Sequence, residues 1–208
     1  MVISAISVIS DREWLATRVG TFGAGRSVAG LSAFPAGVVV EPLDVPSAMS
    51  LIDDRSSDSG AAAVIALVGW PTGRHQSLVK AAEARLAGEM GATEVWLAVP
   101  VGAEDEQPDE SALLSDMIAV GQAVGEGVRF GVIAPDPYVA ALADKAGAEV
   151  VAVDAAGGAV PEVQAEVAVF GEIGNIDAVI DWLSRGAARV FPARPDRTLN
   201  QDQRLPAR

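Results

Sequence analysis

The sequence predicts an α/β protein that folds as a single (β/α)8 barrel of the TIM type. Apolar runs of strand length alternate with helix-length segments along its 208 residues. Three of the expected helices end in the same turn, at Gly91-Ala92, Gly147-Ala148 and Gly186-Ala187, and a new apolar strand begins within a few residues of each. Because glycine takes the left-handed conformation that ends a helix at little cost, the repeated turn indicates a repeated βα unit.

The stretch 64–102 contains the clearest of these units. Ala63–Val68 is a continuous apolar run, as expected of a strand buried on both faces, and Glu94–Val99 is the next such strand. The helix between them has an apolar face whose members step four residues apart: Leu78, Ala82, Leu86 and Met90.

The other elements are predicted from the same patterns. We expect strands at residues 2–9, 37–40, 129–134, 150–154, 167–170 and 189–191. We expect helices at residues 11–19, 45–53, 111–125, 138–146 and 176–185. The segment 20–35 is rich in glycine but has no Lys-Ser or Lys-Thr after its glycines, so we interpret it as a flexible connection rather than a phosphate loop.

The barrel is expected to span residues 1–191, and residues 192–208 form an Arg-containing tail. The tail has no helical period, so the last helix of the barrel is expected to be missing or rudimentary. The acidic run 103–110 is interpreted as a solvated loop rather than a metal site.

Composition narrows the class of protein. A net charge of −13 opposes binding to nucleic acid or to an anionic membrane surface. No apolar run is long enough to span a bilayer, and the absence of cysteine removes disulfides and thiolate chemistry. We therefore expect a soluble cytoplasmic protein, and we assign it no metal and no cofactor.

The same central stretch resembles the deoxyribose-phosphate aldolase family, class I aldolases that fold as (β/α)8 barrels. The segments that carry the resemblance are Gly69-Trp70-Pro71-x-Gly73, Val79-Lys80-x-x-Glu83-Ala84, Gly91-Ala92-x-Glu94-Val95 and Val101-Gly102. A weaker match extends the resemblance over about residues 36–190. The resemblance implies a lyase scaffold.

The family's catalytic residues, however, are missing from the matching positions. The resemblance places Ala152 where the family carries its Schiff-base lysine and Ala168 where it carries a second active-site lysine. Trp96 replaces the aspartate that shuttles protons, and Ala193 and Arg194 replace serines that hold the substrate phosphate. These exchanges imply that the family's mechanism does not operate here.

A lysine elsewhere does not replace them. The chain has only Lys80 and Lys145, and both lie inside expected helices. Because the outer helices of a barrel do not reach its mouth, neither amine is placed to form a Schiff base.

Candidate site residues follow the expected strands, because the carboxyl ends of barrel strands form the active face. The candidate catalytic residues are Asp154, Glu172 and His75. The candidate ligand-binding residues are Glu41, Trp70, Arg74, Trp96, Gly171 and Arg194.

Each candidate also has a structural interpretation. Asp154 and Glu172 can act as an acid/base pair or hold a cation, but they can equally cap loop amides or pair with Arg74 or Arg194. The two tryptophans can stack on a ligand or plug the barrel mouth. His75 is either a catalytic base or a solvated loop residue.

Three functions remain open. The first is a divergent barrel without Schiff-base activity, retained to bind a small sugar or phosphorylated ligand or to act as a partner protein, with self-association into a homo-oligomer. The second is an enzyme whose chemistry has moved to Asp154, Glu172, Arg74 and His75. The third is an active carbon-carbon lyase of the aldolase family.

Overall fold

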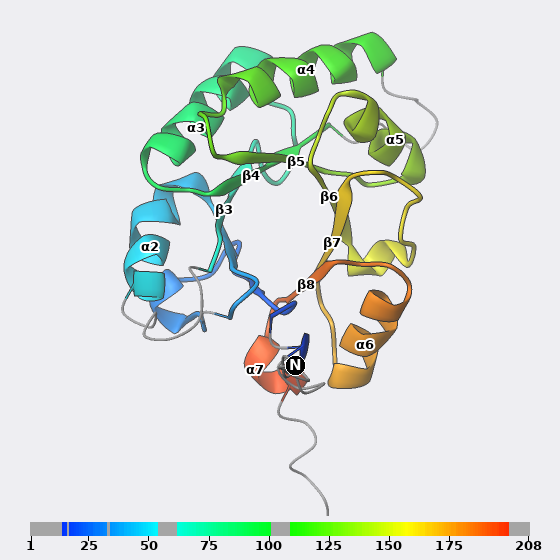
Figure 1. Ribbon diagram of the computed structural model, residues 1–208. Coiled ribbons are helices and arrows are strands. Elements are labelled where there is room, and N and C mark those ends of the chain that lie inside the picture. The colour runs from blue at the N-terminus through cyan, green and yellow to red at the C-terminus, as the bar shows by residue number, and fades with distance from the viewer. Residues whose placement is uncertain (1–13, 16, 33, 54–61, 101–108, 200–208) are drawn as a thin grey trace, which may run out of the picture.

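Eight parallel strands form a nearly closed ring with helices around its outside in the computed structural model (Figure 1). The structure describes residues 14–15, 17–32, 34–53, 62–100 and 109–199. The strands follow sequence order: β1 Thr21–Phe22, β2 Val38–Val40, β3 Val64–Val68, β4 Glu94–Ala98, β5 Arg129–Ile133, β6 Val150–Asp154, β7 Glu166–Gly171 and β8 Arg189–Pro192. A parallel bridge between Val19 and Val190 joins the last strand to the residues just before β1. The predicted (β/α)8 fold is confirmed.

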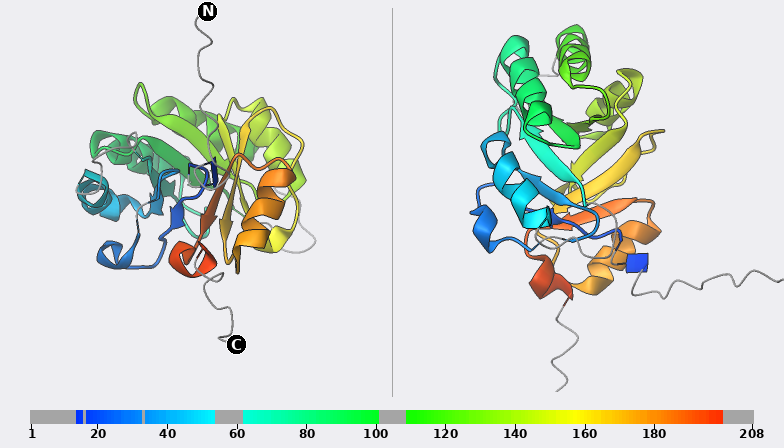
Figure 2. Two further views of the ribbon diagram at one scale, coloured as in Figure 1. Left: turned by 60° about the horizontal axis from the view of Figure 1, so that its bottom comes forward. Right: turned by 60° about the vertical axis from the view of Figure 1, so that its left-hand side comes forward.

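The helices cover the outside of the strands in every view (Figures 1 and 2). Their bounds are α2 Val45–Asp53, α3 Ser77–Glu89, α4 Glu110–Ala123, α5 Pro137–Lys145, α6 Ile176–Ser184 and α7 Pro195–Leu199, with 3-10 turns η1 Val28–Gly30, η2 Pro42–Asp44 and η3 Ala155–Gly157. Side chains of Asp109, Asp136 and Asn175 cap α4, α5 and α6 by accepting from backbone N–H groups of the first turn. The helix α7 reaches Leu199, the last described residue, so the expectation of a missing or rudimentary last helix stays a prediction.

The first strand differs from its prediction. The run 2–9 lies outside the described residues, and β1 lies within the segment 20–35 that we interpreted as a flexible connection. A Cβ atom on Gly20 would lie 2.3 Å from the ring of Phe191, and one on Gly23 would lie 2.9 Å from the carbonyl of Val39. Glycine at these positions therefore permits close approach of neighbouring strands and does not signal a loop. The helix expected at 11–19 also ends early, since Val19 already pairs with β8.

The helix α3 presents its apolar face to solvent, against the usual pattern. Its buried residues are Lys80, Ala84 and Ala87, whereas Leu78 is 81% exposed and Leu86 is 54% exposed. The two small alanines let the helix approach the strands closely, and the large apolar side chains stay outside. This face is therefore free to contact another surface.

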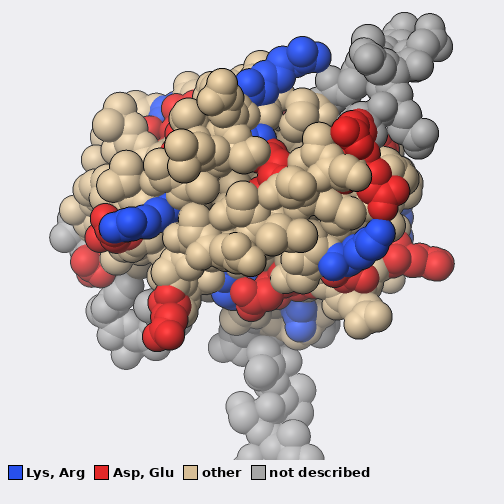
Figure 3. Space-filling view, turned by 90° about the horizontal axis from the view of Figure 1, so that it is seen from above, with Lys and Arg blue, Asp and Glu red and all other residues tan. Residues whose placement is uncertain are grey.

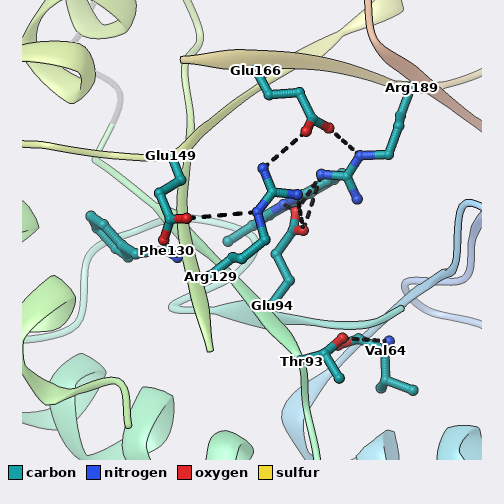
Figure 4. A network of polar contacts seen from close by, with 9 residues as sticks. Val64, Thr93, Glu94, Arg129, Phe130, Glu149, Glu166 and Arg189 are labelled. Carbon is teal, nitrogen blue, oxygen red and sulfur yellow. Dashed lines mark hydrogen bonds and ion pairs between the residues drawn. The ribbon is translucent and has the colours of Figure 1, made fainter. Parts of the chain in front are cut away.

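An ion network closes the amino-terminal end of the barrel (Figure 4). It joins the first residues of four strands, Glu94 of β4, Arg129 of β5, Glu166 of β7 and Arg189 of β8. Arg129 lies 3.1 Å from Glu94 and 2.9 Å from Glu166, and Arg189 lies 2.8 Å from Glu94 and also pairs with Glu166. Burial lowers the pKa of Arg189, but the charges of both glutamates and their hydrogen bonds outweigh it and raise the pKa above its ordinary value. This end of the barrel is filled by paired charges.

The division of the chain at residues 191 and 192 stays a prediction, since β8 continues through Pro192 and α7 follows it. In the described part of the chain, none of the helices combines the length and the apolar character needed to cross a membrane.

Candidate ligand site at the barrel mouth

A cavity of about 630 Å³ opens at the carboxyl ends of β1, β6, β7 and β8. It brings together four of the predicted site residues, Asp154, Glu172, Gly171 and Arg194. The other described lining residues are Phe22, Ala24, Arg26, Ala155, Ala156 and Ala193. The carboxyl ends of the barrel strands thus form the site, as the fold predicts.

Asp154 ends β6 and orients the turn that follows it. Its Oδ1 accepts a hydrogen bond of 2.8 Å from the backbone N–H of Ala156, the first of the structural alternatives weighed for this residue. Gly171, at the end of β7, has a φ of 117°, and a Cβ there would lie 3.0 Å from the same oxygen. A side chain at position 171 would therefore crowd the carboxylate and strain the backbone.

Arginine residues supply the positive charge of the cavity. Arg26 comes from the loop after β1, and its guanidinium donates to the carbonyl of Ala193, beside Arg194. Two guanidinium groups and two carboxylates thus line one opening. Such a set can bind an anionic group through the arginines and accept hydrogen bonds from hydroxyl groups through the carboxylates.

Arg26 is a cavity residue that the sequence did not predict, because the glycine-rich segment 20–35 is typical of a connection. The pattern Phe22-Gly23-Ala24-Gly25-Arg26 was visible, but it lacked the lysine of a phosphate loop. Thr21 and Phe22 are residue types typical of strands, and the glycines on either side of them are the signal that could have indicated a strand just before Arg26.

Aromatic side chains pack beneath this cavity and fill the barrel interior. Phe22 stacks on Phe170 with ring centroids 4.8 Å apart, and Trp70 meets the same two rings edge-on at 5.9 and 6.1 Å. Trp96 is fully buried next to Phe170 and Phe191, and its indole N–H donates to Glu94 Oε1 over 2.5 Å. Trp96 is therefore not at the barrel mouth, where we expected it, because it lies in the middle of β4 and its indole points toward Glu94 at the amino-terminal end. Trp70 is half-buried against Phe22 and Phe170.

Ala152 and Ala168 lie within this packing. They are fully buried, occupy facing positions of β6 and β7, and share one apolar cluster with Trp96 and Phe170. Positions 152 and 168 thus carry methyl groups packed among aromatic rings, whereas the resemblance implies lysine amines at both positions.

Trp70 and Trp96 belong to the ring packing and do not line the cavity, and three further predicted site residues belong to neither. Glu41 is half-buried just after β2, where it begins the turn η2. Arg74 and His75 are exposed on the loop between β3 and α3. The hypothesis of relocated chemistry thus retains only Asp154 and Glu172 at one place.

Both lysines of the chain lie in outer helices, as predicted. Lys80 of α3 is 1% exposed; its amine donates to the carbonyl of Gly73 over 2.9 Å and pairs with Asp116 of α4. Lys145 of α5 lies 2.9 Å from Glu110, and the hydrogen bond and charge of that carboxylate raise the pKa of the lysine. A Schiff base needs an unprotonated amine, so this pairing acts against such a role.

Metal binding has no support in the described residues, since no group of three or more His, Asp or Glu side chains is placed to hold an ion there.

Comparison with known proteins gives relatives for part of the sequence. No protein-family model matches the chain. A deoxyribose-phosphate aldolase of Nocardia farcinica is 42% identical over 87 residues, which are 42% of this chain and 37% of that protein. One of Mycolicibacterium paratuberculosis is 38% identical over 109 residues, 52% of this chain and 44% of that protein. The chain thus matches less than half the length of these curated relatives.

Solved structures extend the likeness of fold. A structure described as a putative deoxyribose-phosphate aldolase from Coccidioides immitis has a TM-score of 0.69 at 18% identity, covering 92% of this chain and 86% of that one. The tetrameric deoxyribose phosphate aldolase from Aeropyrum pernix has a TM-score of 0.67 at 19% identity, covering 88% of each chain. The chain is therefore similar to deoxyribose-phosphate aldolases in sequence over about half its length, and in fold over most of it.

Proposed function

We propose that this chain is a divergent aldolase-like barrel that binds a small phosphorylated or otherwise anionic sugar at its mouth without Schiff-base catalysis. The observation that carries the proposal is the interior of the barrel. Ala152 and Ala168 lie side by side on neighbouring strands within a cluster of aromatic rings, and neither lysine lines the cavity. A carbonyl carbon held in that cavity has no amine to attack it.

The cavity supports the choice of ligand. Arg26 and Arg194 suit a phosphate or carboxylate group, because guanidinium groups bind such anions with paired hydrogen bonds. Asp154 and Glu172 suit sugar hydroxyls, which donate to carboxylate oxygens. Both kinds of contact are available from one opening, so a phosphorylated polyol matches its charges better than a neutral sugar.

Borohydride trapping tests the catalytic half of the proposal. Wild-type protein incubated with 2-deoxyribose 5-phosphate and borohydride should gain no mass, because reduction traps only a Schiff base. A covalent adduct that peptide mass spectrometry places on Lys80 or Lys145 would show an active lyase and overturn the proposal. Cleavage of the same compound without an adduct, abolished in Asp154→Asn or Glu172→Gln, would instead support chemistry at the carboxylates.

Thermal shift measurements test the ligand half. We expect 2-deoxyribose 5-phosphate or ribose 5-phosphate to raise the melting temperature in a saturable way, and unphosphorylated ribose to have much less effect. Arg194→Gln should weaken binding about tenfold or more, since a hydrogen bond to a charged group contributes roughly 1.5–3 kcal/mol. Arg85→Gln is the matched control, because Arg85 is an exposed arginine on α3 outside the cavity. Equal shifts in both variants would contradict the assigned site.

Self-association completes the proposed function. One structural neighbour, the aldolase from Aeropyrum pernix, is described as tetrameric. We therefore propose a homo-oligomer as the working form. The cytoplasmic location expected from the composition stays a prediction.

A further inference from the structure

The exposed apolar side chains of this protein are concentrated on one side of it. Eight large apolar residues of the described chain are strongly exposed, and five of them line a single groove between η2 and α3. They are Leu43, Leu78, Val79, Leu86 and Met90. Scattered exposed apolar residues are ordinary, but a contiguous group marks a contact surface.

The groove has a volume of about 550 Å³, and Pro42, Ala82 and Glu83 complete its lining. Leu43 is 88% exposed and Leu78 is 81% exposed, so the groove is not covered by other described parts of the chain. Glu83 is its one charged residue, and that carboxylate already accepts a hydrogen bond of 2.7 Å from the backbone N–H of Gly69. The groove therefore carries little charge of its own in a strongly acidic protein.

The neighbouring helix α4 adds a further surface with few charges, and the exposed ion pair of Arg85 and Glu89 lies on α3 outside the groove lining. Figure 3 views the protein from the side of α3, α4 and α5, and its centre is mostly free of charged side chains, which gather toward the margins. Between Glu110 and Glu126, the one charged residue of α4 is Asp116, which is buried against Lys80. The exposed residues of α4 include Ser111, Ala112, Ser115 and Ile118.

We propose that this surface, formed by η2 and the outer faces of α3 and α4, binds a second copy of the same chain in antiparallel fashion. The apolar stripe of α3 is symmetric along the helix, because Leu78, Ala82, Leu86 and Met90 are evenly spaced about position 84. A two-fold axis passing by that position places Leu78 opposite Met90 of the partner and Ala82 opposite Leu86 of the partner. Each leucine then meets either the small Ala82 or the flexible Met90. The surface is thus complementary to itself, as a two-fold interface requires.

The exposed apolar area of the groove is smaller than the area of a stable interface, so we expect the partner to contact both α3 and α4. The five exposed groove residues present on the order of 500 Å², the size of the largest apolar patch on a typical monomer, and such patches are often functional. A stable interface covers roughly 800 Å² on each partner, so the groove supplies more than half and the uncharged face of α4 must supply the rest. The inference locates the self-association proposed above, and it does not depend on any ligand at the barrel mouth.

Light scattering on the full chain tests the interface. Wild-type protein should have at least twice the monomer mass of 21.3 kDa, whereas Leu86→Glu and Leu86→Lys should lower the association constant a hundredfold or more and run near 21.3 kDa. Each substitution enters a two-fold interface twice, so its effect is doubled. Ile180→Glu is the control, because Ile180 is 43% exposed on α6, outside the groove, and the variant should keep the wild-type mass. Circular dichroism should report the same fold for all variants.

Disulfide trapping tests the antiparallel register. The chain has no cysteine, so each introduced thiol is unique. A mixture of the single variants Ala82→Cys and Leu86→Cys should form a covalent dimer on oxidation faster than either variant alone. A monomeric wild-type protein, or an oligomer that survives both Leu86 substitutions, would overturn the proposal. Because these readouts are mass and cross-linking, their failure is distinct from failure of the ligand-binding proposal.

Discussion

Replacing Lys80 by methionine should destabilise the barrel strongly although the residue is far from the cavity. The Lys80 and Asp116 side chains are 2% and 8% exposed, and they join α3 to α4. The lysine amine donates to Asp116 Oδ2 and to the carbonyl of Gly73, and Asp116 Oδ1 has no hydrogen-bond partner within the described residues. Methionine keeps the packing of the stem but leaves a carboxylate and a carbonyl without their donor. Removing one member of a buried pair costs roughly 3–5 kcal/mol.

Urea unfolding followed by circular dichroism measures this cost. A loss of roughly 3–5 kcal/mol is a large part of the 5–15 kcal/mol typical of a folded domain, so the midpoint should shift clearly. The double variant Lys80→Met/Asp116→Leu should recover most of the loss, because it removes the unpaired charge as well. Arg85→Met, which breaks an exposed pair with Glu89, should cost less than about 1 kcal/mol. If Lys80→Met costs no more than this exposed control, the assignment of a stabilising buried ion pair is wrong.

Three further predictions concern other parts of the barrel. Arg189→Met should lower the free energy of unfolding by roughly 3 kcal/mol in the same urea experiment, because Glu94 is 2% exposed and loses its closest cation. The thermal shift that a sugar phosphate causes at the barrel mouth should persist in this variant. Gly171→Val should abolish the thermal shift given by a sugar phosphate, whereas Gly174→Val, where a Cβ meets nothing within 4 Å, should retain it. The hydrogen bond and charge of Lys145 lower the pKa of Glu110, so a carboxyl NMR titration should place its midpoint below 4.5, and Lys145→Met should raise it. The small stabilisation from this exposed pair is present at neutral pH and is lost as pH falls through the pKa of Glu110.

The strands and turns of this barrel could be predicted because their signals are local. Parallel strands buried on both faces appear in the sequence as short apolar runs, and β3 and β6 begin and end within a residue of their predicted bounds. The glycines at 91, 147 and 186 all adopt positive φ, as the repeated turn required. Asp154, Glu172, Gly171 and Arg194 met in one cavity because each follows a strand, and strand ends converge on one face.

The features that the sequence did not reveal depend on contacts between distant residues. Glu94 and Arg189 pair across 95 positions, and no local pattern links them. The sequence showed an apolar face on α3, but the face that meets the strands contains Lys80, whose ion-pair partner Asp116 lies on α4. A rule that places apolar faces inward could not anticipate a helix that buries a lysine and two alanines.

The packing of the barrel interior separates this chain from a Schiff-base enzyme more firmly than the two alanines alone. A lysine at position 152 or 168 would place its side chain in the cluster that Trp96, Phe170 and Phe191 already fill. Interiors are packed closely, so such a chain would have to displace a ring or distort the strands. A reactive amine and the aromatic packing therefore compete for the same space. What remains accessible is the rim above the rings, where Arg26 and Arg194 can still hold an anion beside Asp154 and Glu172. This competition for space supports our proposal of a binding function at the rim in place of carbon-carbon bond cleavage in the interior.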